Sequence, residues 1–165
     1  MAKLSGLRFP HSLWDRLTDP SLIETRELEA SQEARLDRLR GEVLKHLEWL
    51  LNSRSTFGAR VHASEVLRES VVAYGLPDIS GLRPGDSRDR DQLERILVEV
   101  IQRFEPRLRD VQVEFNPESQ DRSRSMLHYR VRARIQVKPI DKPILIDTLL
   151  EVGSKAFVVQ GVAEP

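Results

Sequence analysis

The stretch DQLERILVEVIQRFEPRLRDVQVEF, residues 91–115, carries the patterns that decide the fold. Its first part has apolar residues at spacings of three and four, which predicts one apolar stripe on an amphipathic helix: Leu93, Ile96, Leu97, Val100, Ile101 and Phe104. Asp91 is the expected N-cap, because Glu94 follows three positions later as in a capping box. The sequence therefore predicts a helix that begins at Asp91.

A charged corner and a strand follow this helix. Pro106 ends the helix, because its ring disfavours helical backbone angles at Glu105. Beyond Arg107, apolar residues alternate with polar ones, which predicts a strand with its apolar side at Val111, Val113 and Phe115. The stretch is thus a helix, a Glu-Pro-Arg corner and a strand.

Two further helices are expected before this stretch. Residues 33–51 form the first, with one apolar face: Leu36, Leu39, Val43, Leu47 and Leu50. Ser64 caps the second, whose apolar positions include Leu67, Val71 and Tyr74. Gly75 fits the left-handed position that ends a helix, and Pro77 prevents the helix from continuing.

The last third of the chain predicts strands. Residues 127–138 alternate most clearly, with one face formed by Tyr129, Val131, Ala133, Ile135 and Val137 and the other by Arg130, Arg132, Arg134, Gln136 and Lys138. Pro139 and Pro143 are expected to bracket a short connection that leads to a strand at 144–152. Gly153 and Ser154 are expected to form a turn that leads to a last strand at 156–162. The predicted class is α+β: about three helices followed by an antiparallel sheet of about four strands.

The beginning of the chain differs from the rest. Leu13, Trp14 and Leu17 form an isolated apolar cluster, separated from the first long helix by a charged linker. Such a short helical peptide is not stable alone, so the cluster must dock on its own domain or on another protein. We interpret residues 1–30 as an anchoring segment with its linker and residues 31–165 as a single domain.

Composition excludes several classes of function. The 165 residues carry 26 basic and 26 acidic side chains, so no overall field attracts nucleic acid or a membrane surface. The arginine-rich strand face is better explained as a solvated sheet face than as a nucleic-acid interface. Cysteine is absent and no apolar run has membrane-spanning length. We expect a cytoplasmic protein with no direct membrane insertion.

Sites for cofactors or metals are not expected. The four histidines, His11, His46, His62 and His128, are far apart in sequence, and no two have metal-ligand spacing. No glycine-rich phosphate loop follows a strand, and no nucleophile lies in a recognisable elbow. We therefore predict no cofactor and no metal.

Glu105 is the one candidate catalytic acid. A glycoside hydrolase needs two carboxyl groups, one of them held protonated by an apolar pocket. Glu105 stands between Arg103 and Arg107, and neighbouring cations favour the charged carboxylate, which suits an ion pair better than an acid catalyst. We predict no catalytic residue, with a peptidoglycan-cleaving hydrolase that uses Glu105 as the alternative.

Several motifs resemble those of one family. They are Leu13 to Leu17 (LWDRL), Leu51 to Arg54 (LNSR), Ser70 to Asp78 (SVVAYGLPD), Phe104 to Leu108 (FEPRL) and Pro143 to Thr148 (PILIDT). In this order they resemble TssE, the small baseplate subunit of the type VI secretion system, which is related to the small wedge protein of contractile phage baseplates. The FEPRL corner is the most specific of the five.

The resemblance implies a structural role. The family's members sit in the cytoplasmic baseplate wedge beside TssF and TssG, with TssK as a further candidate partner, and help to seed the contractile sheath of TssB and TssC. Phage relatives have carried a lysozyme label, which is the source of the hydrolase alternative. The partner-binding residues that we expect are Glu105, Pro106, Arg107 and Leu108 at the corner and Leu13, Trp14 and Leu17 in the anchoring segment.

The final strand is the expected partner-binding edge of the sheet. Residues 156–162 are short, largely apolar and uncharged, and lack the charged residues that normally guard an exposed edge. An open edge presents N–H and C=O groups at regular spacing, which can add a strand from another chain. The opposing possibility is that this strand lies inside the sheet, covered by the helices.

Overall fold

The computed structural model describes residue 17 and residues 32–55, 64–83, 86–117, 126–138 and 140–163. The chain divides into two compact units, Met1–Leu39 and Arg40–Pro165. In the first unit the described residues are Leu17 and the first turns of α2. Residues 1–30 lie otherwise outside the described residues, so their anchoring role stays a prediction.

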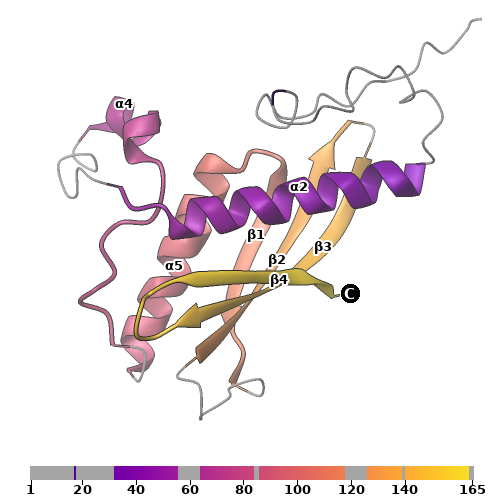
Figure 1. Ribbon diagram of the computed structural model, residues 1–165. Coiled ribbons are helices and arrows are strands. Elements are labelled where there is room, and N and C mark those ends of the chain that lie inside the picture. The colour runs from indigo at the N-terminus through magenta and orange to yellow at the C-terminus, as the bar shows by residue number, and fades with distance from the viewer. Residues whose placement is uncertain are drawn as a thin grey trace, which may run out of the picture. The chain divides into compact units, whose positions relative to one another are not determined.

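The order of elements confirms the α+β prediction, with the helices before the strands (Figure 1). In chain order they are α2 (Gln32–Asn52), α4 (Glu65–Arg68), the 3-10 helix η3 (Val71–Ala73), α5 (Ser87–Phe104), β1 (Leu108–Phe115), β2 (Met126–Val137), β3 (Ile140–Glu151) and β4 (Phe157–Ala163). The four strands form one antiparallel sheet in the order β1-β2-β3-β4.

Helix α5 begins earlier than the sequence pattern predicts. Its N-cap is Asp86 instead of Asp91, and the Asp86 carboxylate accepts a hydrogen bond from the N–H of Arg88 at 2.9 Å. The first helical turn is entirely polar, so apolar periodicity gives no sign of it. Four of the six predicted stripe residues, Leu93, Leu97, Val100 and Ile101, are buried, and Ile96 and Phe104 are intermediate.

The second predicted helix is much shorter than expected. Helix α4 has one turn, and the chain then forms η3. Leu67 and Val71 were expected on the apolar face of one helix, but both side chains are exposed, so this prediction was wrong. Gly75 does have the predicted positive φ, at +101°, and a Cβ there would lie 2.6 Å from the backbone of Ser53. Only glycine fits this close crossing of the two segments without strain.

Strand β3 also begins earlier than predicted. Ile140 already pairs with Val137, so Pro143 lies inside the strand instead of ending a connection. The last pair between β3 and β4 joins Leu145 to Ala163, and Pro143 therefore lies beyond the reach of β4. At that point β3 is itself an edge of the sheet, where proline is tolerated because no neighbour needs its missing N–H.

The turn between β3 and β4 lies at the predicted place but has different backbone chemistry. The residue with positive φ is Lys155, at +57°, and no positive φ occurs at Gly153. The N–H of Lys155 donates to the C=O of Glu151, and the N–H of Glu151 donates to the C=O of Ala156. A left-handed residue after a turn is a common hairpin closure, and here lysine provides it.

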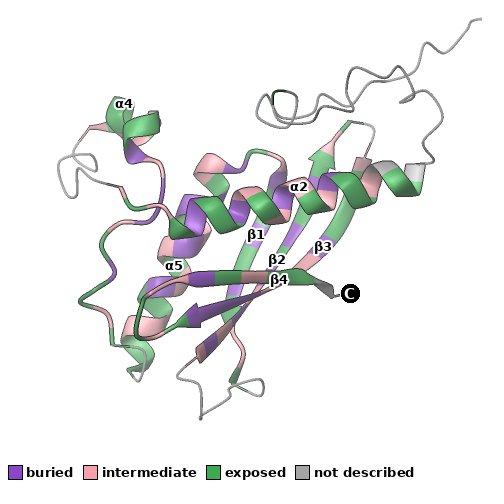
Figure 2. Cartoon of the chain, viewed as in Figure 1, coloured by how far each residue is buried: buried purple, intermediate pink, exposed green. Residues whose placement is uncertain are grey.

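Burial alternates along β2 as the sequence predicts (Figure 2). Tyr129, Val131, Ala133 and Ile135 are buried, while the arginines between them face solvent to different degrees. Within the second unit the buried side chains of α5 and of the last turns of α2 complete the core: Val43, Leu47, Leu50 and Leu51 from α2 and those named above from α5. Strands β1 and β4 remain as the two edges.

Candidate functional site

The Glu-Pro-Arg corner is a closed ion pair. Helix α5 ends at Phe104, and Glu105 and Arg107 follow before β1 begins at Leu108. Two parallel hydrogen bonds join the side chains, from Nε of Arg107 to Oε1 of Glu105 and from Nη2 to Oε2, each 2.6 Å long. This bidentate geometry is the strongest arrangement available to a guanidinium and a carboxylate.

The corner is also fixed through its main chain. The N–H of Glu105 donates to the C=O of Ile101, which satisfies the end of α5, and the N–H of Leu108 donates to the C=O of Glu105. The C=O of Arg107 accepts from the N–H of Gln136 on β2. The corner therefore joins the end of α5 to the sheet at a fixed angle.

The four predicted corner residues differ in how far they are buried. Glu105 and Leu108 are buried, with 4 % and 1 % of their surface exposed, whereas Pro106 is exposed and Arg107 is intermediate. A partner that approaches this corner can reach Pro106 and part of Arg107 without any rearrangement. Partner binding by the corner stays a prediction, and the structure confines direct contact to these two residues.

Two residues of α2 complete the corner and were missed in the sequence. Nη2 of Arg107 lies 2.7 Å from Nδ1 of His46, and Nη1 lies 3.6 Å from Oε2 of Glu42. A guanidinium has donors only, so Nδ1 of His46 is the acceptor in this hydrogen bond. Glu42 and His46 are four residues apart, so the helical spacing shows that they share a face. The sequence gives no sign, however, that this face meets Arg107.

Arg103 takes no part in the pair with Glu105, contrary to the expectation from sequence proximity. Its Nη2 bonds Oε1 of Glu99 at 2.6 Å, one turn earlier on α5. Tyr74 lies near the corner instead and packs edge-on against Phe104 with ring centroids 5.5 Å apart. Burial, and secondly the negative charge of Glu105, raise the pKa of the Tyr74 hydroxyl above its ordinary value.

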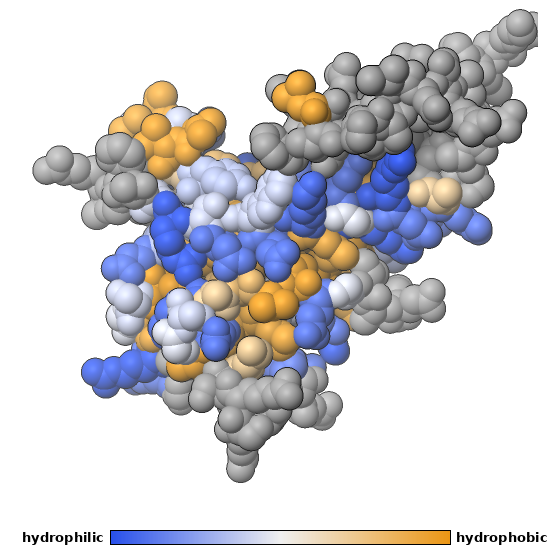
Figure 3. Space-filling model, viewed as in Figure 1, coloured by the Kyte–Doolittle hydropathy of each residue, from blue (hydrophilic) through white to orange (hydrophobic). Residues whose placement is uncertain are grey.

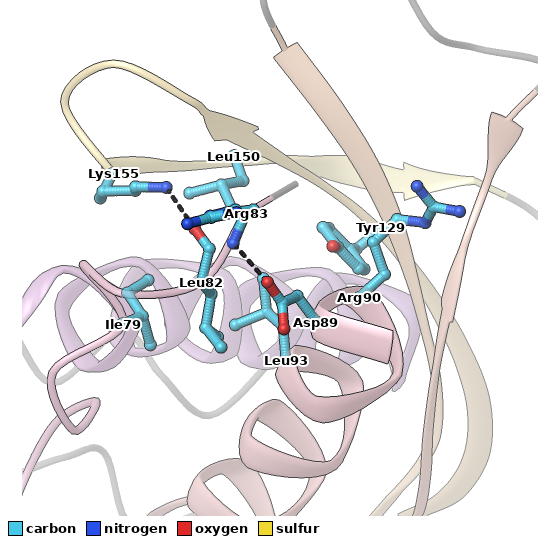
Figure 4. A pocket seen from close by; sticks show the side chains of 9 residues that line it. All are labelled: Ile79, Leu82, Arg83, Asp89, Arg90, Leu93, Tyr129, Leu150 and Lys155. Carbon is cyan, nitrogen blue, oxygen red and sulfur yellow. Dashed lines mark hydrogen bonds between the residues drawn. The ribbon is translucent and has the colours of Figure 1, made fainter. Parts of the chain in front are cut away.

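This geometry does not suit acid catalysis. Both carboxylate oxygens of Glu105 accept hydrogen bonds from Arg107, so neither is directed towards a site where a substrate could take a proton from it. A small cavity of about 10 Å³ lies elsewhere, beside the start of α5 (Figure 4), and Glu105 does not line it. Its lining includes one carboxylate, Asp89, together with Arg83, Arg90 and Lys155. About 10 Å³ holds roughly one water molecule and no sugar ring.

Strand β4 lies at the edge of the sheet, as the sequence analysis expected. The opposing possibility, that this strand is internal, is therefore excluded. The last residues of α2 contact the beginning of β4. The side-chain amide of Asn52 donates to the C=O of Phe157 at 2.8 Å and accepts from the N–H of Phe157 at 2.9 Å. Arg54 also donates to the C=O of Lys155, at 2.6 Å.

The outer face of the sheet carries arginines that are paired with carboxylates. Arg130 pairs with Asp147 at 3.0 Å, Arg132 with Glu114 at 2.8 Å, and Arg134 with Asp141 at 2.7 Å, in each case across neighbouring strands. Acidic side chains thus neutralise the positive charge that the sequence of β2 alone suggests. A solvated, ion-paired face agrees with the interpretation made from the sequence.

An apolar patch lies over α4 and η3, where Figure 3 shows hydrophobic side chains at the surface. Its members are Val66, Leu67, Val71 and Val72, of which Val71 is 88 % exposed. In the anchoring segment, Leu17 is described and exposed, whereas Leu13 and Trp14 lie outside the described residues. Among the described residues, no group of histidine and carboxylate side chains could hold a metal ion.

In a comparison with known proteins, a family model described as "Baseplate wedge protein gp25" matches residues 37–140, which include most of α2, all of α5, the Glu105–Arg107 corner, β1 and β2. No curated protein and no solved structure matches the chain. In the part of the chain that the structure describes, no helix is long and apolar enough to cross a membrane.

Proposed function

The chain belongs to the baseplate wedge protein gp25 family, which also contains TssE, and we propose that it is the TssE-type subunit of a type VI secretion baseplate. Membership indicates a structural component of a phage-like baseplate. In the proposed role the protein binds the wedge subunits TssF and TssG in the cytoplasm, with TssK as a further partner. It also helps to start the contractile sheath of TssB and TssC.

The closed corner supports a structural role more strongly than a catalytic one. Both carboxylate oxygens of Glu105 accept hydrogen bonds from Arg107, and the pair lies between α5, α2 and the sheet. Such a buried and fully bonded pair fixes the relative orientation of its elements, provided that all its partners are present. A subunit that starts the assembly of a polymer requires this rigidity, because it sets the position of the first polymer subunits. We propose that the protein is not an enzyme.

The open edge of β4 supports a mechanism for seeding the sheath. The strand lies at the end of the sheet, and its Val158 side chain is exposed. A partner strand could pair with the outward N–H and C=O groups of this edge that have no partner among the described residues, and so extend the sheet. Main-chain pairing fixes the register between β4 and the partner strand, and a polymer needs a defined position for its first subunit. We propose strand addition at β4 as the contact with the sheath.

The first experiment is a pulldown of the intact chain from lysate of its own cells, with the bound proteins identified by mass. We expect TssF and TssG in the bound fraction. Their absence, under conditions in which TssF and TssG recover each other, would contradict a wedge role. A parallel peptidoglycan assay should show no more turnover for wild type than for Glu105→Gln, and a clear difference would support the hydrolase instead.

The anchoring segment can be tested separately. If Leu13, Trp14 and Leu17 bind a partner, deletion of residues 1–20 should leave the melting temperature of the remainder nearly unchanged and weaken recovery of TssF and TssG. A large drop in melting temperature would show instead that the cluster packs on its own domain.

A further inference from the structure

We infer that the end of α2 acts as a stop on the open side of β4, so that a partner strand pairs from Val159 towards the C-terminus and cannot reach Phe157. This inference rests on the proposed strand addition and specifies its register. It follows from three features of the structure: the direction of each main-chain group of β4, the rigidity of the end of α2, and the irregularity of β4 at Gly161.

The direction of the β4 main-chain groups follows from antiparallel geometry. The C=O of Ala156 accepts from Glu151 on β3, and Phe157 exchanges both of its main-chain bonds with Asn52 instead. In an antiparallel pair, successive residues direct their N–H and C=O alternately towards the partner and away from it. Val158 is therefore bonded to β3, opposite Leu149, whereas Val159 directs its N–H and C=O to the open side.

Asn52 occupies the position that a strand residue would take opposite Phe157. Its amide supplies one donor and one acceptor, as a peptide unit does, and Arg54 takes the next open C=O, that of Lys155. A paired strand would run roughly 4.8 Å from β4, within the space that these side chains and their main chain fill. A second strand can therefore not lie along residues 155–157 unless the end of α2 moves.

Several contacts oppose such a movement. Leu50 and Leu51, directly before Asn52, are buried in the core. Ser53 bonds Leu76 through the main chain at 2.9 Å, and Gly75 packs against the backbone of Ser53. Moving the end of α2 would break this junction and expose two buried leucines to water, which is unfavourable. The stop is therefore a fixed part of the fold.

The open portion of β4 is correspondingly short. Pairing with β3 shifts between Asp147 and Ile146, which leaves Gly161 as the extra residue of a bulge on β4. A bulge interrupts the ladder and bends the strand. The open groups that remain are those of Val159 and of the residues around Gly161. The partner that fits is a short extended protein segment, apolar where it lies beside Val159 on the side of the core.

Residue-resolved amide hydrogen exchange tests this register, with the complex of the full chain and co-expressed TssB–TssC as the bound state. In the free wild type we expect Phe157, bonded to Asn52, to exchange slowly and Val159 to exchange fast. Binding should slow exchange at Val159 by at least tenfold. In Asn52→Ala, Phe157 should exchange fast both free and bound, because Arg54 and the main chain at the end of α2 remain in place and still exclude a partner strand. Val158 serves as the internal reference, since β3 protects it in every state.

The outcomes separate this inference from the proposed function. If Phe157 in Asn52→Ala becomes as protected as Val159 on binding, the partner strand passes the end of α2 and the stop is disproved. If a complex forms but Val159 exchanges as fast as in the free protein, strand addition at β4 is wrong while a baseplate role remains. If wild type forms no complex with TssB–TssC, the proposed sheath contact fails and the register inference fails with it.

Discussion

The Glu105–Arg107 corner and the β4 edge were both expected to meet partners, and the structure gives them opposite properties. At the corner every charged group of the pair is bonded within the chain, and two of four residues are buried. At the edge, Val159 directs its main-chain groups outwards beyond the point where Asn52 has satisfied Phe157. The first region stabilises the fold, and the second leaves bonding capacity for another chain.

This difference suggests a general way to separate supporting from contacting residues in a small assembly protein. A distinctive motif such as Phe104 to Leu108 attracts attention because its residue types are unusual together. Its distinctiveness comes from the demand of the closed pair for one acid, one base and a turn between them. The proposed contact region, β4, is ordinary in sequence, and the structure identifies it by main-chain groups that have no partner among the described residues.

The largest effect should come from breaking the corner. Glu105→Gln removes the bidentate carboxylate of Arg107 and leaves the longer 3.6 Å contact with Glu42, and we expect a loss of about 3 kcal/mol in the free energy of unfolding, measured by urea denaturation. The matched control is Glu99→Gln, which breaks the exposed pair with Arg103 and should cost about 0.5 kcal/mol or less. Equal small losses in both variants would show that the corner is not a structural support.

The next effect concerns the support behind the edge. Gly75→Ala places a Cβ against the Ser53 backbone in a left-handed conformation, and we expect a loss of about 2 kcal/mol. Gly81→Ala, where a Cβ meets no neighbour and φ is not positive, is the control and should change stability by less than about 0.5 kcal/mol. If both variants melt like wild type, the end of α2 is less rigid than the stop requires.

A pair of proline substitutions compares the two sides of β4 directly. Val158→Pro removes a donor that pairs with β3 and should cost about 1–2 kcal/mol more than Val159→Pro, whose donor faces the open side. Thermal melts and urea midpoints of both variants measure the difference. A Val159→Pro variant that is the less stable of the two would contradict the assigned directions of the main-chain groups.

The smallest effect is expected on the outer face of the sheet. Arg132 and Glu114 form an exposed pair, so Arg132→Gln should lower stability by about 0.5 kcal/mol or less, and by still less at high salt. This substitution also tests whether the outer face of the sheet binds a baseplate partner. If Arg132→Gln abolished recovery of a baseplate partner without changing stability, the outer face and not the edge would be the interface.

Local patterns predicted much of this fold. The 3.6-residue period placed α2 and α5, and the alternation in residues 127–138 placed β2 with its buried side correct. The errors in the boundaries of α5 and β3 occur where the local sequence pattern gives no information. The polar first turn of α5 has no periodicity. Pro143 was expected to end the connection before a strand at 144, because its tolerated position at the sheet edge depends on where β4 stops.

The candidate site was predictable only in part, since its chemistry depends on contacts between distant residues. The sequence identified Glu105 and Arg107 as neighbours of opposite charge. It could not show that His46 and Glu42 meet them across 61 and 65 positions respectively, or that Asn52 bonds Phe157 from 105 positions away. Such pairings are set by the packing of helices on the sheet and leave no local signal.

The most direct test of the central claim is sheath assembly in cells that carry Val159→Pro as their only copy of this protein. The substitution removes one outward N–H and fills the open side of β4 with a proline ring, while the bonds to β3 remain. We predict a protein that folds, is recovered with TssF and TssG, and fails to start normal sheaths. Normal sheath number and length with the folded variant would contradict strand addition at the β4 edge.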